Sequence, residues 1–455
     1  MVDRAVGNQD SAARWHPDGS VATAAELALA IERRITAGTL AAGDRMEPVR
    51  ALAGRLGLAP NTVAAAYRSL GERGLLVGEG RRGTFVATRP PVVAPVDDSP
   101  PPGLIDLASG SPDPELLPDP GPALAVAADR YRSVGYGAPA VDGELARLLR
   151  ADLAGDGVSV EHLVVVGGAL DGIERVLVAN LRPGDRVGVE DPGYGPVFEL
   201  LAAIGLRPVP MPVDDRGVTV DGLSTALAER VAAVIVTPRA HNPTGAAFDA
   251  DRAGQLAALL AGRPEVVVIE DDHANRVAGA PFHSIVPPDA VRWATVRSVA
   301  KSLGPDFRLA ALAADGATAS RVAGRLALGP GWVSHLVQLV VTRLLADPGL
   351  PAVLDRAADA YAAGRELVVG RLAAAGVPAR GRSGLNVWVP VADEGAVVAA
   401  LAHRGFAVRS GARYRRLSPP GVRITVAGRP ADELTAVAEA LAEVLMVTPG
   451  ATRSG

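Results

Sequence analysis

The sequence predicts an α/β protein in which a small helical module precedes a larger domain built on a sheet. From residue 104 onward, helical segments alternate with short strands that are apolar throughout, such as AAVIVTP and EVVVIEDD. Strands of this kind belong to a parallel or mixed sheet that helices cover on both faces. A chain of 455 residues is also too long for one ordinary core, so we expect at least two domains.

The first 88 residues predict a polar lead and a compact helical module. Residues 1–20 are expected to be disordered. Residues 21–88 predict three short helices, at about 23–37, 49–56 and 61–73. A threonine that can cap the first helix, the spacing of apolar residues and the glycines that end each helix indicate these bounds. Two strand-like pieces, LLVGEG and RRGTFVAT, then surround a turn rich in glycine and arginine. Three helices and a two-stranded wing make a winged helix-turn-helix domain.

The charge of this module differs from that of the whole chain. Residues 21–88 contain nine arginines and six acidic residues, a net charge of +3, whereas the whole chain carries −4. A basic head on an acidic body suits a domain that binds DNA.

A linker separates the head from the body. Residues 89–103, RPPVVAPVDDSPPPG, are dense in proline and predict a semi-rigid, extended connection. The body occupies residues 104–447. After about residue 326 its pattern changes to long helices followed by the strand-like pieces LNVWVPV and VRITVAG. We therefore expect a small α+β subdomain at about 326–447, after a large α/β part.

The composition excludes several classes of site. The sequence has no cysteine, which excludes disulfides, thiolate nucleophiles and cysteine-ligated zinc, and we expect no metal site. No apolar run approaches the length of a membrane span, and the N-terminus lacks the apolar core of a signal peptide. We expect a cytoplasmic protein that does not bind membranes.

One lysine stands among 46 basic residues. Lys301 is the only lysine in the chain, and arginine supplies every other basic side chain. Arginine can replace lysine in surface ion pairs and phosphate contacts, but imine formation needs a primary amine that can lose its proton. Lys301 is therefore the candidate for covalent chemistry with a carbonyl compound.

The head resembles the GntR-type DNA-binding domain. The resemblance covers the segment GTLAAGDRMEPVRALAGRLGLAPNTVAAAYRSLGERGLLVGEGRRGTFV, with many positions matched at fixed spacing. It implies that the third helix enters the major groove and that the wing reaches the backbone or minor groove. Pro60 and Ala64 stand where some members carry arginine, which reduces the expected base contacts. The residues implied to contact DNA, unless the arginines are merely solvated charges, are Arg50, Asn61, Thr62, Arg81, Arg82 and Gly83.

The body resembles the fold-type I aminotransferases, whose cofactor is pyridoxal phosphate. This fold class consists of a large α/β domain with a parallel or mixed sheet and a small α+β domain. The resemblance covers about residues 104–447 and includes HNPTG, EDPGYGPVF, GGALDGIERV and RSVAKSLGPDFRLA. By this resemblance, the cofactor-binding residues are Lys301, Asp271, His273, Asn242, Tyr194, Gly168, Ala169, Leu170, Ser298, Arg308 and Tyr136.

The resemblance also implies a role for each of these residues. Lys301 would form the internal aldimine. Asp271 would face the pyridine nitrogen, although the residues alone do not separate it from the adjacent Asp272. Asn242 and His273 would lie at the 3-hydroxyl. Tyr194 would stack on the ring unless it is a core tyrosine. The phosphate would bind Ser298, Arg308 and the backbone of Gly168, Ala169 and Leu170, with Tyr136 reaching the neighbouring subunit.

Some positions depart from the family pattern. His273 stands where tyrosine is usual, and a histidine titrates near neutrality, which argues against efficient transamination. Leu170 replaces a residue that is commonly polar, and the surroundings of Tyr136 lack the usual glycine and arginine. Arg423, in VRITVAG, matches the arginine that binds an α-carboxylate, unless it forms a structural ion pair.

The order of the two parts resembles the MocR subfamily of GntR regulators. The resemblance implies a homodimeric transcription regulator that binds operator DNA and responds to pyridoxal phosphate. The small-molecule effector is then a B6 vitamer, an amino compound or both, and the variants in HNPTG and EDDH favour control of B6 metabolism. Physiological enzyme turnover is not expected, and the residues leave open whether the protein activates or represses.

Two other interpretations remain at this point. The chain could be a pyridoxal-phosphate-dependent aminotransferase with an accessory DNA-binding head, because Lys301, Asp271, Asn242, Arg308 and Arg423 permit that chemistry. It could also be a DNA-binding scaffold whose pocket binds no cofactor. Turnover of amino acids would indicate the first, and a protein that no B6 vitamer alters would indicate the second.

Overall fold

The structure is a computed structural model of the whole chain. It describes residues 21–36, 39–41, 43–72, 75–78, 83–87, 102–132 and 135–447. The expected disordered lead, the wing residues Arg81 and Arg82, and most of the proline-rich linker lie outside the described residues. The chain divides into two compact units, an N-terminal one and a larger one, which are treated separately.

The N-terminal unit has the expected winged helix-turn-helix elements. Its elements are α1 (Ala24–Thr36), α2 (Val49–Leu56), α3 (Pro60–Glu72), β1 (Leu76–Gly78) and β2 (Thr84–Val86). The two strands pair antiparallel. A reciprocal cap begins α1, because Thr23 Oγ1 accepts from the Glu26 amide while the Glu26 carboxylate accepts from the Thr23 amide. Gly57, at φ 67°, ends α2 in the left-handed conformation and allows the tight turn into α3.

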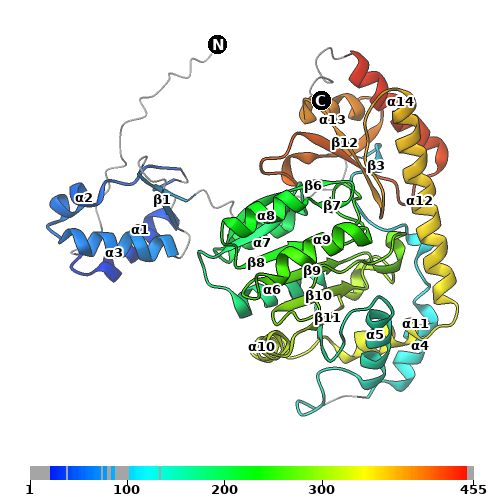
Figure 1. Cartoon of the computed structure of the whole chain (residues 1–455), viewed down its shortest axis with the longest axis horizontal. Helices are drawn as coiled ribbons and strands as arrows, with labels where there is room; N and C mark the ends of the chain where they lie inside the picture. Colours follow the sequence, from blue (N-terminus) through cyan, green and yellow to red (C-terminus); the bar gives the residue numbers. More distant parts are fainter. Residues whose placement is uncertain are drawn as a thin grey trace. The chain divides into compact units, whose positions relative to one another are not determined.

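Eight strands form the main sheet of the larger unit (Figure 1). Their order is β4-β11-β10-β9-β8-β5-β6-β7. The central strands β10, β9, β8 and β5 are parallel, and β11 pairs antiparallel with β10 and β4. The strands are β4 (His162–Val166), β5 (Arg186–Asp191), β6 (Arg207–Asp214), β7 (Gly217–Val218), β8 (Ala233–Val236), β9 (Val267–Asp272), β10 (Trp293–Ser298) and β11 (Ala310–Ala314). Every residue of β8, β9, β10 and β11 is buried, which explains their apolar character.

Eight helices in the described part of this unit precede, connect or follow these strands. They are α4 (Gly121–Arg130), α5 (Gly143–Gly155), α6 (Ala169–Asn180), α7 (Gly195–Ala203), α8 (Val220–Ala228), α9 (Ala250–Ala261), α10 (Gly316–Ala327) and α11 (His335–Leu345). Helix α6 lies close to the sheet at Gly172, where a Cβ would be only 2.9 Å from Val296 Cγ1. Among the described residues, no single helix is long and apolar enough to cross a membrane. Only α11 and the following helix, Leu350–Ala374, meet the length and composition as a pair, bent by 82°.

A second sheet of four strands forms the smaller part of this unit. Its strands are ordered β12-β14-β13-β3, with β12 (Asn386–Pro390), β13 (Phe406–Ser410), β14 (Gly421–Thr425) and β3 (Ile105–Leu107). Helices α12 (Leu350–Ala374), α13 (Glu394–Ala402) and α14 (Ala431–Val447) accompany it, and α12 packs against α14 (Figure 1). The sequence pattern placed this sheet after residue 326, but β3 comes from the start of the body and pairs parallel with β13. The α/β fold class is confirmed. Its small α+β part is formed by two separate segments of the chain, one that contains β3 and one that contains β12, β13 and β14.

Candidate functional site

A cavity of about 360 Å³ lies where β9 and β10 end and where the small sheet meets the main sheet. Ligands of open α/β folds bind at this carboxyl edge. A larger groove around Trp388 contains none of the predicted site residues. The predicted residues that line the 360 Å³ cavity are Ala169, Leu170, Tyr194, Asn242, Asp271, His273, Ser298, Lys301, Arg308 and Arg423.

Lys301 lies three residues beyond the end of β10 and points into this cavity. Its Nζ donates a hydrogen bond to the Gly110 carbonyl oxygen at 2.6 Å. Burial, and then the positive charge of Arg423, lowers the pKa of Lys301 to about 8. The amine therefore loses its proton more easily than a surface lysine does, which makes it a better nucleophile at neutral pH.

Asp271 and Asp272 have different surroundings. No described residue forms a hydrogen bond with Asp271 Oδ1, although the side chain is buried in the cavity wall. Burial, followed by the charges of Asp272 and Glu190, raises the pKa of Asp271 to about 8. Asp271 Oδ1 is thus a buried acceptor without a described hydrogen-bond partner, available to a cationic or N–H group, while Asp271 Oδ2 lies 4.0 Å from His273 Nδ1.

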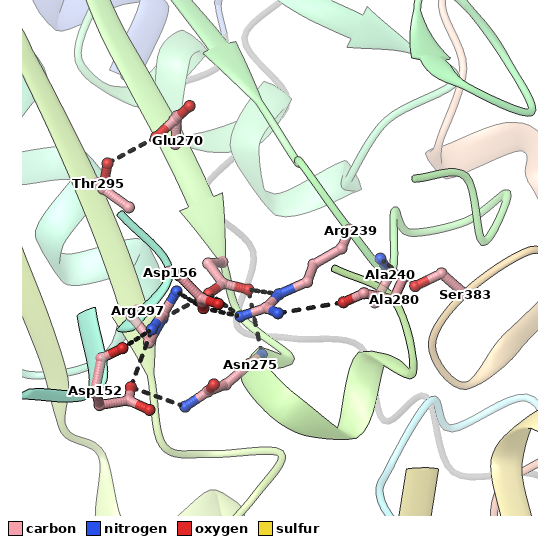
Figure 2. Close-up of polar contacts among 11 residues, drawn as sticks. Asp152, Asp156, Arg239, Ala240, Glu270, Asn275, Ala280, Thr295, Arg297 and Ser383 are labelled. Carbon is pink, nitrogen blue, oxygen red and sulfur yellow. Dashed lines mark hydrogen bonds and ion pairs between the residues drawn. The ribbon is translucent and has the colours of Figure 1, made fainter. Parts of the chain in front are cut away.

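Asp272 is fully buried and belongs to an ion-pair network. Figure 2 shows its members Arg239, Arg297 and Asp156. Its carboxylate accepts from Arg239 at 2.8 Å and from Arg297 at 2.6 Å. Burial opposes its ionisation, but these two arginines lower its pKa to about 2. The same arginines reach Asp156, just beyond α5. The carboxylate of Asp272 is therefore engaged by two arginines, whereas Asp271 lines the cavity, so Asp271 is the better candidate for contact with a ligand.

His273 and Asn242 both line the cavity. Burial, and then the charge of Lys301, lowers the pKa of His273 to about 4, so the imidazole is neutral at pH 7. The expectation that it titrates near neutrality is therefore wrong, because it was based on the free side chain. The Asn242 Oδ1 atom accepts a hydrogen bond from Arg423 Nη1 at 3.1 Å.

The N-terminus of α6 forms a cradle for an anion. Gly168 precedes the helix at φ 106°, and a Cβ there would lie 3.0 Å from Arg308 Nη2. Only glycine allows the backbone and the guanidinium to come this close. Ser298 is buried beside them, while Leu170 contributes no polar side chain. Helix amides, a hydroxyl and an arginine together suit a phosphate group.

Arg423 is a buried arginine that forms no ion pair with any described carboxylate. It lies on β14 with 3% of its surface exposed, and it donates to the Ala108 carbonyl oxygen and to Asn242. Its guanidinium packs over the ring of Tyr414 at 5.2 Å, and its Nε has no described partner. Burial lowers its pKa. Because a buried guanidinium is costly without an anion, this position suits a ligand carboxylate.

The two predicted tyrosines differ in position. Tyr194 lines the cavity and is partly exposed. Tyr136 is 96% exposed and is not among the cavity residues. Its ring packs edge-on against Trp332, with centroids 6.1 Å apart. The structure therefore does not bring Tyr136 into the pocket of its own chain.

Sequence reasoning missed one wall of the cavity. These residues come from the turn after β3 and from the small sheet: Ala108, Ser109, Gly110, Leu385, Asn386, Arg409, Arg413 and Tyr414. No motif marks them, and they are far from Lys301 in the sequence. Only the pairing of β3 with β13 brings the turn to the pocket.

Of the candidate DNA-contact residues that the structure describes, three lie on the head helices and one precedes β2. Arg50 on α2 and Asn61 on α3 are exposed, and Thr62 is half-buried. Gly83 precedes β2 at φ 110°, and a Cβ there would lie 3.2 Å from Arg45 Nε. A buried hydrogen bond joins α3 to the segment before α2, because the Tyr67 hydroxyl donates to the Glu47 carbonyl oxygen.

Comparison with known proteins gives the family. Residues 102–441 match the aminotransferase class I and II family, and residues 23–86 match the gntR family of bacterial regulatory proteins. The vitamin B6 salvage pathway transcriptional repressor PtsJ of Salmonella typhimurium is 38% identical over 431 residues, which cover 93% of this chain and 98% of PtsJ. The chain belongs to the MocR-type regulators of the GntR family.

Other MocR-type regulators match over shorter regions. The pyridoxine biosynthesis regulator PdxR of Corynebacterium glutamicum is 29% identical over 62% of this chain and 64% of PdxR. The probable rhizopine catabolism regulator MocR of Rhizobium meliloti is 28% identical over 64% of this chain and 65% of MocR. Among solved structures, Pyrococcus horikoshii kynurenine aminotransferase superposes with a TM-score of 0.70 at 21% identity, over 76% of this chain and 91% of the enzyme. This last similarity concerns the fold alone.

The pocket of this MocR-type regulator fits pyridoxal phosphate, the cofactor of the aminotransferase family. The cofactor presents a pyridine N–H, and Asp271 Oδ1 is a buried acceptor without a described partner. It presents a phosphate, and Arg308 lies beside the N-terminus of α6. It requires a primary amine, which Lys301 alone supplies.

Proposed function

We propose that this MocR-type regulator senses B6 vitamers through its aminotransferase-like domain and controls genes of B6 metabolism as a homodimer. The observation that carries the proposal is the match to PtsJ over 93% of the chain, which includes both the head and the pocket. The more distant PdxR is also a regulator of pyridoxine biosynthesis by name. The pocket geometry supports a ligand with the charges of pyridoxal phosphate.

The proposed roles follow from the contacts of each residue. Bound pyridoxal phosphate supplies an aldehyde that condenses with a primary amine. Lys301 provides that amine, and its lowered pKa of about 8 keeps part of it unprotonated at neutral pH. Asp271 would accept a hydrogen bond from the protonated pyridine nitrogen. Neutral His273 and Asn242 would hold the 3-hydroxyl, while Ser298, Arg308 and the start of α6 would bind the phosphate.

Arg423 is proposed to bind the carboxylate of an amino compound. It lines the cavity, is buried, and forms no ion pair with a described carboxylate. A planar guanidinium can make a bidentate contact with such a group. This would allow an amino compound to act as a second effector beside the B6 vitamer.

Dimerisation is proposed from the exposed aromatic surface around Tyr136. Tyr136, Trp332 and His335 form a chain of ring contacts, and Tyr136 is almost fully exposed. In a symmetric dimer this surface would be buried and Tyr136 would reach the partner's phosphate site. Two heads would then bind two half-sites of operator DNA. Cofactor binding regulates DNA binding only if it favours one arrangement of the dimer over another.

The test combines spectroscopy with DNA binding. The protein is titrated with pyridoxal phosphate, and Lys301→Ala serves as the comparison. A visible absorbance band that the variant lacks is expected. DNA ligands are then selected from random duplexes, and their affinity is measured with and without the cofactor. A band without any change in DNA affinity would contradict sensing.

An aminotransferase remains the alternative, favoured by the presence of Lys301, Asp271 and Arg423 in one cavity. Turnover of amino acids at about 1 per second or faster, without DNA selection, would establish it instead.

A further inference from the structure

One buried titratable pair lies next to the pocket and has no role in the assignments above. Glu190 is near the end of β5, and His241 directly precedes Asn242. His241 is fully buried and Glu190 is 6% exposed. The His241 Nε2 atom lies 3.3 Å from Glu190 Oε2. A carboxylate and an imidazole this deep in the protein need a physical explanation, because buried ionisable groups are costly.

Neither group is fully satisfied. No described residue forms a well-aligned hydrogen bond with Glu190 Oε1 or with His241 Nε2. Two atoms of the cavity residues, Asp271 Oδ1 and Arg423 Nε, likewise have no described hydrogen-bond partner. Buried polar atoms without partners are rare in folded proteins and mark strain or function.

The ring of His241 has an oxygen beside each nitrogen. Its Nδ1 lies 2.7 Å from Thr244 Oγ1, whose oxygen also accepts from the Ala246 amide, and its Nε2 lies 3.3 Å from Glu190 Oε2. In the tautomer whose Nδ1 accepts from the Thr244 hydroxyl, the Nε2 proton faces Glu190, and the pair then places one carboxylate charge at this position.

This charge lies close to the cofactor carboxylate. Strand β8 lies between β5 and β9, and His241 follows β8, so the pair extends from β5 toward Asp271. The charge of Glu190 is among the causes that raise the pKa of Asp271, and His241 is among those that lower the pKa of His273. The other charged groups that act on these two residues are Asp272 and Lys301.

We propose that Glu190, oriented by His241, is a positioning residue of the cofactor site whose buried negative charge retains the proton shared by Asp271 and the pyridine nitrogen. A nearby anion makes the loss of that proton less favourable, so the site keeps its protonated form to higher pH. His241 also links this charge to the turn that carries Asn242. The inference rests on the proposed role of Asp271 toward pyridoxal phosphate.

The test is a pH titration of the absorbance band of the bound cofactor in wild type and Glu190→Gln. The substitution keeps the size of the side chain and removes the charge. We expect the pH at which half of the band is lost to fall by about one unit. His241→Gln should shift the midpoint in the same direction, because it removes the ring whose Nε2 lies 3.3 Å from Glu190 Oε2 and orients that carboxylate. Glu190→Asp, which restores a carboxylate, should recover most of the shift.

Glu270→Gln is the matched control. Glu270 is also a fully buried glutamate, on β9, but its carboxylate accepts from Ser284, Ile285 and Thr295 and does not line the cavity. This variant should lose thermal stability and keep the wild-type midpoint.

The outcomes separate this inference from the proposed function. No cofactor band in wild type would contradict the proposed function, and the inference with it. A wild-type band with an unchanged midpoint in Glu190→Gln would overturn the inference alone. If Glu190→Gln does not fold, an unchanged midpoint in His241→Gln would overturn it equally.

Discussion

Asp271 and Asp272 are neighbours in the chain, yet one is available to a ligand and the other is fully engaged. Successive strand residues point to opposite faces of a sheet, so the last two residues of β9 have different environments. Asp272 meets Arg239 and Arg297 on one side, while Asp271 Oδ1 has no described hydrogen-bond partner on the other. This separation predicts opposite effects for the two substitutions.

Asp271→Asn should stabilise the ligand-free protein and weaken cofactor binding. The pKa of Asp271 is about 8 in the folded chain, above its unfolded value of about 4. Its contribution to stability is therefore present below pH 4 and is lost as the pH rises toward 8. Removing the carboxyl should raise the free energy of unfolding by about 1.4 kcal/mol for each pH unit between 4 and 8, and leave it unchanged near pH 4. Urea unfolding at both pH values measures this, and cofactor affinity should fall by at least about tenfold.

If Asp271→Asn lowered the free energy of unfolding equally at pH 4 and pH 8, the raised pKa of Asp271 would be contradicted. Such a result would mean that the Asp271 carboxylate already has a partner in the ligand-free protein.

Asp272→Asn should destabilise the protein strongly. It leaves Arg239 and Arg297 buried without their shared carboxylate, and breaking a buried pair costs about 3–5 kcal/mol. The pKa of Asp272 is lowered to about 2, so its stabilising effect is present above pH 4 and is lost as the pH falls through 2. The difference in free energy of unfolding between wild type and Asp272→Asn should therefore be large at pH 7 and smaller at pH 3. A difference that is the same at both pH values would argue against an ionised Asp272.

Attachment of the cofactor should depend on the ionisation of Lys301. Only the unprotonated amine reacts, and the pKa of Lys301 is lowered to about 8. The second-order rate constant for band formation should rise about tenfold per pH unit below 8 and level off above it. Stopped-flow absorbance measures this rate. Lys301→Arg keeps the positive charge and should form no band at any pH, whereas a midpoint near 10 would contradict the buried environment.

The sequence predicted the main sheet and the covalent residue more securely than the shape of the pocket. The strands were recognised because burial on both faces requires apolar runs, and Lys301 because it is the only lysine. The choice between Asp271 and Asp272 depended on where Arg239 and Arg297 lie, and nothing in the local pattern contains that information. The wall formed by Ala108 and Gly110 depended on the pairing of β3 with β13, between segments about 300 residues apart.

Arg423 should determine the response to amino compounds, and its loss should slow cofactor attachment at neutral pH without preventing it, because the Arg423 charge contributes to the lowered pKa of Lys301. Its guanidinium is buried near Asn242, and no described carboxylate pairs with it. With the cofactor bound, Arg423→Gln should weaken the spectral response to a panel of α-amino acids by about 10–100-fold. Arg423→Lys should recover only part of it, because an ammonium cannot make the bidentate contact. If the response is lost together with cofactor binding, Arg423 has a structural role instead.

Asn61 and Arg50 should contribute to DNA binding in different ways. Asn61 is exposed at the start of α3, where a recognition helix meets base edges, and Arg50 is exposed on α2, where it can meet a phosphate. Against a selected duplex, Asn61→Ala should cost about 1–3 kcal/mol and relax the preference at one base pair. Arg50→Ala should weaken binding to all duplexes alike and reduce the slope of log affinity against log salt by about one. Arg33→Ala, which removes an exposed arginine of α1, is the control and should change neither quantity. A reversed pattern, with Asn61 changing the salt slope and Arg50 the base preference, would mean that α2 and not α3 enters the major groove.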